Sequence, residues 1–534
     1  MTPILQVRDL AIRLRDGSAE RTIVSDLDFS IERGQMVALV GESGSGKSLT
    51  ALSLLGLLPD RMAIGDHSRI LLDGNDIARL SGRSRRAIRG GRIGMIFQDP
   101  FASLNPVMRI GEQVIEAIRA HSEVPSPEAR TMAIALLDEV GIPEPATRVD
   151  AWPHQLSGGM RQRVMTAIAL ASGPDLLIAD EPTTALDATI QAQVLALLDQ
   201  LRRSRGLAIL LISHDLGIVE GHADRVMVMH RGRIVENAPA SRLFSEPANP
   251  HTRELLAAVP RMDGGPEPRP QDAASTPLVV ATDLVKEFGI GKGLFARGRK
   301  VRAVDGVSIH VARGEILGLV GESGSGKSTL GRTLLMLEPP TSGSVTFGGI
   351  ELGALDGEPL RALRRRMQLV FQDESGSLNP RRTVAESIAE GLIVHGLASR
   401  AEQPSRIAAL MEEVGLDPAL GGRRPGQLSG GQRQRVGIAR ALAVDPEFLV
   451  CDESVSSLDP TVQAQILALL LELGQRRGLA CLFIAHDLAV VRQVADTIAV
   501  MRRGRIVETG GAAEVIETPR HPYTMELLKA ARAK

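Results

Sequence analysis

The hydrophobic residues of this 534-residue chain are grouped in short apolar runs rather than in long ones. Met36–Gly41, Leu176–Ala179 and Leu207–Ile212 have the length of buried strands. None of the apolar runs approaches the roughly 20 residues that a helix needs to cross a bilayer. The N-terminus has no basic region followed by a long apolar stretch. The pattern therefore predicts a globular, cytosolic protein without a transmembrane span or a signal peptide.

The succession of strand, loop and helix occurs twice. An apolar strand leads into GESGSGKS at Gly41–Ser48, and the same octapeptide returns after a second apolar strand, at Gly321–Ser328. Later segments, among them FQD and LSGG, recur in the same order and at a nearly constant separation. Such a long repeat indicates that a whole domain was duplicated. We expect a first domain at residues 1–262, a Pro/Gly-rich linker at 263–277 and a second domain at 278–534.

Each octapeptide has the form G-x-x-x-x-G-K-[ST], which binds nucleotide phosphates where it joins a strand to a helix. The glycines let the backbone wrap closely around the phosphates and turn its N–H groups toward them. The lysine reaches the β- and γ-phosphates, and the hydroxyl after it can bind Mg²⁺. The predicted nucleotide-binding residues are Gly41, Ser43, Gly44, Gly46, Lys47 and Ser48 in the first domain, and Gly321, Ser323, Gly324, Gly326, Lys327, Ser328 and Thr329 in the second.

An acidic strand end completes each predicted site. LLIADE ends in Asp180 and Glu181, and FLVCDE ends in Asp452 and Glu453. An aspartate at such a position can hold the hydration shell of Mg²⁺. The glutamate after it can polarise an attacking water as a general base. The predicted metal-site residues are Ser48, Asp180, Ser328 and Asp452, and the predicted general bases are Glu181 and Glu453.

Two further segments, QLSGGMRQRV at Gln155–Val164 and QLSGGQRQRV at Gln427–Val436, resemble the signature of ATP-binding cassette (ABC) ATPases. With the other motifs, the resemblance covers almost the whole chain. It implies an α/β fold of two tandem P-loop NTPase (ABC ATPase) domains, each with a mixed β core and a helical subdomain. It also implies ATP hydrolysis with Mg²⁺, with each signature serving the ATP held by the opposite cassette.

The same resemblance assigns roles to four more residues. Gln98 and Gln372, each in an FQD segment, resemble the glutamine that contacts Mg²⁺ and the attacking water. They are therefore expected to be both catalytic and metal-site residues. His214 and His486, each before an aspartate at the end of an apolar run, resemble the switch histidine that contacts the γ-phosphate.

Two composite sites follow from the resemblance. ALD at Ala185–Asp187 and SLD at Ser457–Asp459 resemble the loops that link such sites. Site one would combine Lys47, Ser48, Gln98, Asp180, Glu181 and His214 with Ser429, Gly430 and Gly431. Site two would combine Lys327, Ser328, Gln372, Asp452, Glu453 and His486 with Ser157, Gly158 and Gly159.

The domains differ where the family usually stacks adenine on an aromatic side chain. The second domain offers Phe288 there, whereas Leu14 occupies the matching place in the first. We expect site one to hold adenine more weakly than site two. Because the principal catalytic residues occur in both copies, we also expect both sites to hydrolyse ATP, at unequal rates.

Composition narrows the choice of partners. The net charge is −1 and aromatic residues make up 2 % of the chain. Nucleic-acid binders usually show a basic balance or stacking aromatics, so the composition does not favour nucleic acid. The basic cluster at Arg83–Arg92 could form a local patch that binds nucleic acid, but a solvated surface helix is the simpler interpretation. Cys451 and Cys481 cannot build a disulfide framework, which fits a reducing compartment.

The flanks of the FQD segments and the two tails resemble one importer group in particular. These segments are Phe97–Val114, Phe371–Ile388, Asn249–Pro260 and His521–Ala530. The group imports dipeptides, oligopeptides, glutathione and nickel, and a fused pair of this length is most like the ATPase of microcin C/oligopeptide importers. The resemblance implies two separate transmembrane permease subunits and a periplasmic substrate-binding protein that delivers peptides. The chain would lie at the cytoplasmic face of the bacterial inner membrane, one copy per transporter, attached through the permeases only.

One alternative function does not involve a membrane. A soluble twin-cassette ATPase acting on ribosomes or nucleic acid would also have two cassettes and no span. Members of the translation-factor group carry a long, charged helical linker, whereas residues 263–277 are few and Pro-rich. This difference favours the importer. The sequence does not select the cargo, because the ATPase of such a system never touches it.

Overall fold

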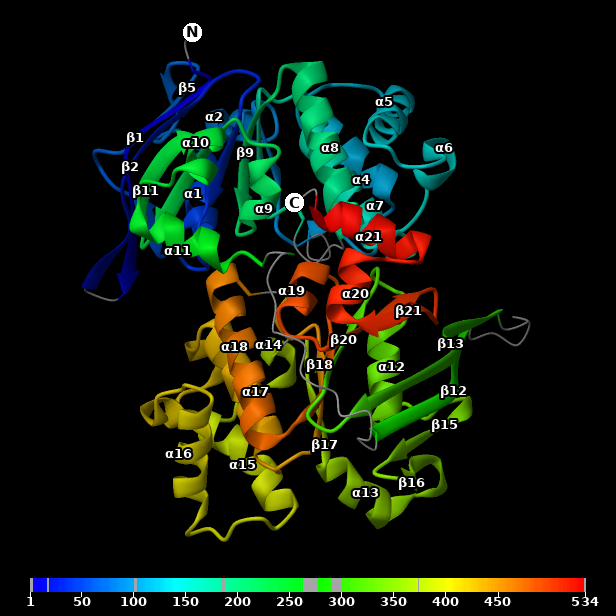
Figure 1. Ribbon diagram of the computed structural model, residues 1–534. Coiled ribbons are helices and arrows are strands. Elements are labelled where there is room, and N and C mark those ends of the chain that lie inside the picture. Colours follow the sequence, from blue (N-terminus) through cyan, green and yellow to red (C-terminus); the bar gives the residue numbers. More distant parts are fainter. Residues whose placement is uncertain are drawn as a thin grey trace.

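The computed structural model is an α/β protein of two similar halves (Figure 1). The first half runs from β1 (Leu5–Asp16) to α11 (Pro250–Ala258), and the second from β12 (Pro277–Ile290) to α21 (Pro522–Arg532). The expected linker, 263–277, lies outside the described part of the chain except for Pro277, which begins β12. The structure describes residues 3–16, 19–99, 103–183, 188–260, 262, 277–290, 299–372, 374–456 and 458–532.

A largely parallel sheet forms the centre of the first half, in the strand order β11-β10-β3-β9-β8-β7. Strand β11 is antiparallel to β10, and the other neighbours are parallel. The apolar runs predicted as strands are fully buried here, because helices pack on one face of the sheet and α1 with an antiparallel sheet packs on the other. The bounds are β3 (Met36–Val40), β7 (Ile93–Ile96), β8 (Leu176–Asp180), β9 (Ala208–Ser213), β10 (Arg225–His230) and β11 (Arg233–Pro239).

The second half repeats this sheet in the order β21-β20-β14-β19-β18-β17. Parallel strands bring their carboxyl ends to one edge, so the loops that follow them meet there. Cys451 and Cys481 lie on neighbouring strands as buried free thiols. The bounds are β14 (Ile316–Val320), β17 (Met367–Val370), β18 (Phe448–Asp452), β19 (Ala480–Ile484), β20 (Thr497–Arg502) and β21 (Arg505–Gly511).

An antiparallel sheet flanks each central sheet. Its order is β2-β1-β5-β6 in the first half, with β4 also paired to β1, and β13-β12-β15-β16 in the second. The apolar faces of the flanking sheet and the central sheet share one core in each half. The remaining bounds are β2 (Ala19–Ile31), β4 (Met62–Ile64), β5 (Arg69–Leu72), β6 (Asn75–Asp76), β13 (Arg299–Ala312), β15 (Ser342–Phe347) and β16 (Ile350–Glu351).

Helices α4 to α7 form a separate helical layer in the first half, and α15 to α17 form its counterpart in the second (Figure 1). In α4, Ile110, Val114 and Ile118 repeat every fourth residue and are buried against α5 and α7. The helices of this layer are α4 (Ile110–Arg119), α5 (Ser126–Glu139), α6 (Pro145–Arg148) and α7 (Gly158–Leu170), with α15 (Val384–Val394), α16 (Gln403–Glu413) and α17 (Gly430–Leu442).

The two halves contact each other in a reciprocal way. Helix α11 of the first half packs against α18 of the second, and α21 of the second packs against α8 of the first (Figure 1). Within the described residues, no helix has the length and apolar composition of a membrane span. The other helices are α1 (Lys47–Leu55), α2 (Gly82–Ile88), α8 (Ala188–Arg205), α9 (Leu216–Glu220), α10 (Ala240–Ser245), α12 (Lys327–Leu334), α13 (Gly357–Arg365), α14 (Glu374–Ser377), α18 (Pro460–Arg477), α19 (Leu488–Arg492) and α20 (Ala512–Glu517).

Candidate nucleotide sites

Each octapeptide joins the end of a central strand to the start of a helix, as predicted. Gly41 follows β3 with a φ of 150°, and a Cβ there would lie 2.1 Å from the carbonyl oxygen of Met229. Gly46 caps α1 in the left-handed region, with a φ of 109°. Ser43 and Gly44 are exposed between them. Only glycine fits the first and last of these positions without strain.

The second octapeptide has the same geometry. Gly326 caps α12 with a φ of 108°, and Gly321 has a φ of 155°. Ser323 and Gly324 are exposed, and Thr329 is half-buried in the first turn of the helix. In both halves, the backbone of the loop thus leads directly into the N-terminus of a helix. Loop N–H groups next to a helix N-terminus are an arrangement that binds phosphate.

Each P-loop lysine is folded back onto its own loop. Nζ of Lys47 donates to the carbonyl oxygens of Gly41 and Glu42, at 2.7 and 2.9 Å. Nζ of Lys327 does the same with Gly321 and Glu322, at 2.8 and 3.0 Å. Burial lowers the pKa of Lys47, although nearby carboxylates oppose this shift. Phosphate oxygens would replace these carbonyls as acceptors.

Each P-loop serine contacts the acid at the end of the neighbouring strand. Oγ of Ser48 donates to Asp180 at 3.1 Å, and Oγ of Ser328 donates to Asp452 at 2.7 Å. Burial raises the pKa of Asp180 to about 6 and also raises that of Asp452. The oxygen donors match the preference of Mg²⁺, and the cost of burying each carboxylate charge would be relieved by a cation.

We predict that Asp180→Asn stabilises the protein when Mg²⁺ and nucleotide are absent. Because the folded-state pKa of Asp180 is raised above its unfolded value, its contribution to stability is present below about pH 4 and is lost as the pH rises through about 6. At pH 7.5 the variant should therefore be more stable by up to about 3 kcal/mol. Differential scanning calorimetry from pH 4 to 7.5 measures the gap, which should shrink toward low pH. The exposed Asp60→Asn is the control, and an equal gap at every pH would contradict the prediction.

The expected catalytic glutamate is held by both of its predicted neighbours in the first half. Nε2 of Gln98 donates to Glu181 at 2.8 Å, and Nδ1 of His214 lies 3.2 Å from the same carboxylate oxygen. Burial disfavours charge on His214, but the hydrogen bond and the charge of Glu181 outweigh it and raise the pKa of the histidine. The glutamate has a φ of 47°, a conformation that non-glycine residues adopt at a cost.

The second half repeats most of this arrangement. Nε2 of Gln372 donates to Glu453 at 2.7 Å, and Glu453 has a φ of 46°. Nζ of Lys327 lies 4.0 Å from the other carboxylate oxygen of Glu453. His486 lines the cavity between the halves, together with Glu453. The structure thus brings together the predicted strand-end, FQD and P-loop residues within each half.

The signature segments begin helices. Ser157 caps α7 and accepts from Met160 N at 3.3 Å, and Ser429 caps α17 and accepts from Gln432 N at 3.2 Å. A Cβ on Gly159 or Gly431 would meet α8 or α18 at 2.7 or 2.4 Å, so these glycines allow close helix packing. Gly158 and Gly430 are the first helical residues. No hydrogen bond among the described residues joins Ser157 or Ser429 to the opposite P-loop lysine, so the composite pairing stays a prediction.

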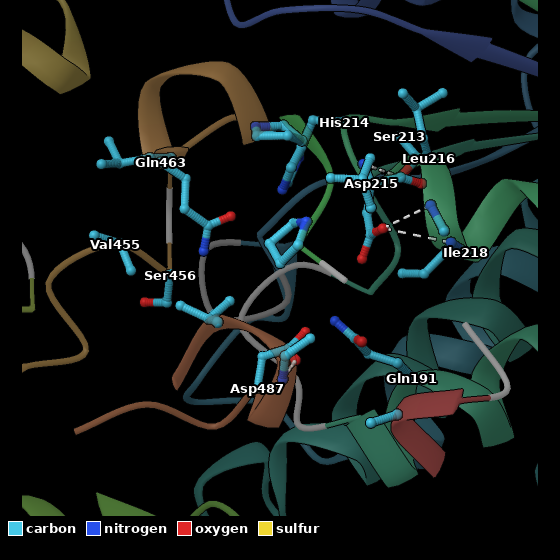
Figure 2. Close-up of a pocket in the computed structure, with 18 of the residues that line it drawn as sticks. Gln191, Ser213, His214, Asp215, Leu216, Ile218, Val455, Ser456, Gln463 and Asp487 are labelled. Atoms are coloured by element: carbon cyan, nitrogen blue, oxygen red, sulfur yellow. Dashed lines mark hydrogen bonds between the residues drawn. The ribbon is translucent and has the colours of Figure 1, made fainter. Parts of the chain in front are cut away.

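A cavity of about 490 Å³ lies between the halves. Figure 2 shows His214 and Asp215 on one side of it and Ser456, Gln463 and Asp487 on the other. Asp459, at the start of α18, is near enough to Lys47 for its charge to act on the lysine. This electrostatic effect across the halves involves the predicted SLD loop. Ser457 of that loop and the whole ALD segment, 185–187, lie outside the described residues.

The expected adenine platform is on an outer strand. Phe288 is exposed on β12, with Nζ of Lys286 5.3 Å from its ring centroid. Leu14 lies on β1, where it pairs with Arg21 of β2 and Met62 of β4. The difference between the two domains therefore persists in the structure. Adenine binding itself stays a prediction.

Tyr523 is a contact of the P-loop that the sequence did not predict. Its Oη accepts a hydrogen bond from the backbone N–H of Glu322 at 3.0 Å, and the side chain is fully buried. This residue belongs to the HPYT motif in the tail of the second half, and from the sequence that motif indicated only a resemblance to the importer group. Nothing in the sequence around Tyr523 indicates a contact with the P-loop, because only the tertiary fold brings α21 to that loop.

Comparisons with known proteins agree with this geometry. Residues 24–184 and 304–456 match the ABC transporter family, and residues 235–288 and 507–533 match the oligopeptide/dipeptide transporter C-terminal region. The chain is 49 % identical to the "Peptidoglycan transport ATP-binding protein YejF" of Agrobacterium fabrum, over 99 % of this chain and 96 % of that protein. It is 46 % identical to the "Glutathione import ATP-binding protein GsiA" of Pectobacterium atrosepticum and 45 % identical to that of Escherichia coli K12, each over 99 % of this chain and 89 % of the relative.

Fold and site together define an ATP-binding P-loop ATPase built from two tandem domains, each with a mixed sheet and a helical layer. The chain belongs to the ABC transporter family, in its peptide importer group. The predicted family, fold class and ATPase activity are thereby confirmed.

Proposed function

We propose that this chain is the ATP-hydrolysing subunit of a bacterial importer for peptides of the dipeptide, oligopeptide or microcin C kind. The observation that carries the proposal is the match to the oligopeptide/dipeptide transporter C-terminal region, which occurs once after each ABC transporter match, at residues 235–288 and 507–533. The transport and import ATPases to which the chain is similar over nearly their whole length support it. The soluble alternative, acting on ribosomes or nucleic acid, is not favoured by these matches.

The proposed assembly contains one copy of this chain, two transmembrane permease subunits and a periplasmic substrate-binding protein. Cassettes at residues 1–262 and 278–534 would supply both halves of the ATPase, so one copy suffices. The chain would be peripheral at the cytoplasmic face of the inner membrane, held there by the permeases.

Exposed apolar side chains at matching places on the two cassettes support the docking of two permeases. Leu57 and Phe97 are exposed in the first half, and Leu337 and Phe371 are exposed at the same places in the second. The phenylalanines immediately precede Gln98 and Gln372. A groove beside Phe371, lined by Leu337 and His395 among others, has a volume of about 300 Å³. A permease helix in this groove, and another at the matching place beside Phe97, would contact the segments that reach the catalytic glutamates.

The residues divide the chemistry between them at each proposed site. Lys47 exchanges its carbonyl partners for phosphate oxygens, while the loop N–H groups and the helix N-terminus hold the remaining charge. Glu181 accepts a proton from the attacking water, and Gln98 and His214 fix the carboxylate that does so. At the second site Lys327, Glu453, Gln372 and His486 take these roles. Ser429 to Gly431 would close site one, and Ser157 to Gly159 would close site two.

Mg²⁺ is the metal that the donor set fits. The oxygens of Ser48 and Asp180, and those of Ser328 and Asp452, are hard ligands beside each P-loop. When bound, the ion neutralises charge on the phosphates. Gln98 and Gln372 would complete the set from the next strand. Two ATP molecules between the cassettes would favour a closed state, and hydrolysis would reopen it.

The test is a pull-down from detergent-solubilised membranes of the native host with the full chain as bait. We expect two permease subunits and a periplasmic binding protein, whose ligand can then be screened among peptides. Leu57→Glu with Leu337→Glu should abolish the capture of permeases, while the exposed Ile350→Glu should retain it. Recovery of ribosomal proteins without permeases would refute the importer and favour the soluble alternative.

A further inference from the structure

Three side chains that can bind a metal meet beside the P-loop of the first half. Glu42 is the second residue of that loop, His230 ends β10, and His251 lies in the first turn of α11. The two imidazole rings have centroids 3.8 Å apart, and Nδ1 of His230 lies 3.9 Å from a carboxylate oxygen of Glu42. One ligand atom from each residue lies within 4.8 Å of the others. All three residues are half-buried.

The donor atoms are placed for a ligand rather than for one another. Nε2 of His251 is buried and has no hydrogen-bond partner, which is costly for a polar atom. Nδ1 of the same ring lies 3.8 Å from the carboxylate of Glu254, and a side-chain rotation of that glutamate would bring it within hydrogen-bond distance, as an outer partner of a metal-binding histidine. Ligands of a tetrahedral zinc ion lie about 3.3 Å from each other, so small side-chain rotations would bring the three atoms into range.

The second half fills the same space in a different way. Arg502 and Tyr523 stand where the first half has His230 and His251, and Glu322 corresponds to Glu42. The guanidinium carbon of Arg502 lies 4.4 Å from the centroid of the Tyr523 ring, and Oη of Tyr523 accepts from Glu322 N at 3.0 Å. The fold therefore satisfies this position without histidine. The pair of histidines in the first half needs another explanation than packing.

We propose that Glu42, His230 and His251 bind one divalent transition-metal ion of the zinc class, in the first half only. Two imidazole nitrogens and one carboxylate oxygen form a donor set typical of Zn²⁺, and the fourth position is left for water. Mg²⁺ prefers oxygen ligands, so this site is chemically distinct from the phosphate sites. The ion would connect the P-loop of site one to α11, the helix that packs against α18 of the other half.

The test is a titration of the tag-free, nucleotide-free full chain with Zn²⁺ in competition with a chromophoric indicator, repeated with Co²⁺, whose visible spectrum reports tetrahedral nitrogen and oxygen ligation. We expect one equivalent per chain. The double variant His230→Arg with His251→Tyr replaces the two histidines by the residues of the second half. It should weaken the binding of Zn²⁺ by at least about 10-fold. His251→Gln, which is close in size, should weaken it in the same direction. Melting curves in a chelator check that both variants fold.

Two results would overturn the site. The first is the absence of stoichiometric binding in the unaltered protein. The second is binding that survives the exchange but is lost in His214→Gln, because the ion would then lie at the catalytic carboxylate instead. Neither result depends on the transported cargo or on the permeases, so the metal site and the proposed importer function can fail separately.

Discussion

Replacement of both Glu181 and Glu453 by glutamine is expected to lower the rate of ATP hydrolysis by at least about 100-fold, the usual contribution of a general base. Glutamine keeps the size of the side chain and can still accept the hydrogen bond that Gln98 or Gln372 donates. It cannot accept a proton from water. The variant should therefore bind ATP and fold normally but fail at the chemical step. Steady-state phosphate release at saturating ATP measures the effect.

The single variants separate the two sites. Because each half has its own glutamate, glutamine and P-loop lysine, each single substitution should lower turnover, by unequal amounts. The exposed pair Glu351→Gln with Glu412→Gln is the matched control for two lost carboxylates. Turnover untouched by Glu181→Gln and abolished by Glu453→Gln would show that site one does not hydrolyse ATP.

Gly326→Ala is expected to disable the second P-loop. The residue has a φ of 108°, and a Cβ there would lie 2.0 Å from the backbone oxygen of Ala303. Ala303 lies on β13 of the flanking sheet, and a backbone atom of a paired strand cannot move aside as a flexible side chain can, so α12 would have to shift. We expect a loss of stability of roughly 3–5 kcal/mol, which places the change among severe single substitutions, together with the loss of ATP binding at site two.

Thermal melting and the stoichiometry of a fluorescent ATP analogue measure the two effects. Bound analogue should fall from two equivalents to one. Gly426→Ala is the control, because that glycine has no positive φ and no atom within 4 Å of an added Cβ. If the Gly326→Ala variant melted at the same temperature as Gly426→Ala and still bound two equivalents of the analogue, the close approach to Ala303 would not be structurally important.

Much of each candidate site was predictable because its residues follow buried strands. A run such as Leu176–Ala179 has the length of a buried strand, and in a parallel sheet the acids after it emerge at the edge where the P-loop lies. The spacing within GESGSGKS fixes a local backbone shape, which is independent of distant contacts. The sequence therefore predicted that Asp180 lies near the P-loop, and the structure joins it to Ser48, 132 residues away in the chain, by a hydrogen bond.

Other features depend on contacts that no local pattern encodes. Asp459 acts on Lys47 only because the two halves pack through α11 on α18 and α21 on α8. Tyr523 reaches the P-loop from a tail helix about 200 residues away, and His251 reaches Glu42 in the corresponding place. In each case the energy of the contact comes from burial against a distant segment, and sequence separation gives no hint of it.

The sequence by itself thus determined the family, through the resemblance of its motifs, and the duplication. It also predicted the residues of each phosphate site, because that prediction rests on buried strands and on short motifs with fixed backbone geometry. The tertiary structure decided how the tails fold back on the P-loops and where the halves touch. It also revealed that the two halves differ beside their P-loops, with two histidines in one and an arginine–tyrosine pair in the other. The physical reason is that packing between distant segments depends on the shape of the whole chain, which local preference does not contain.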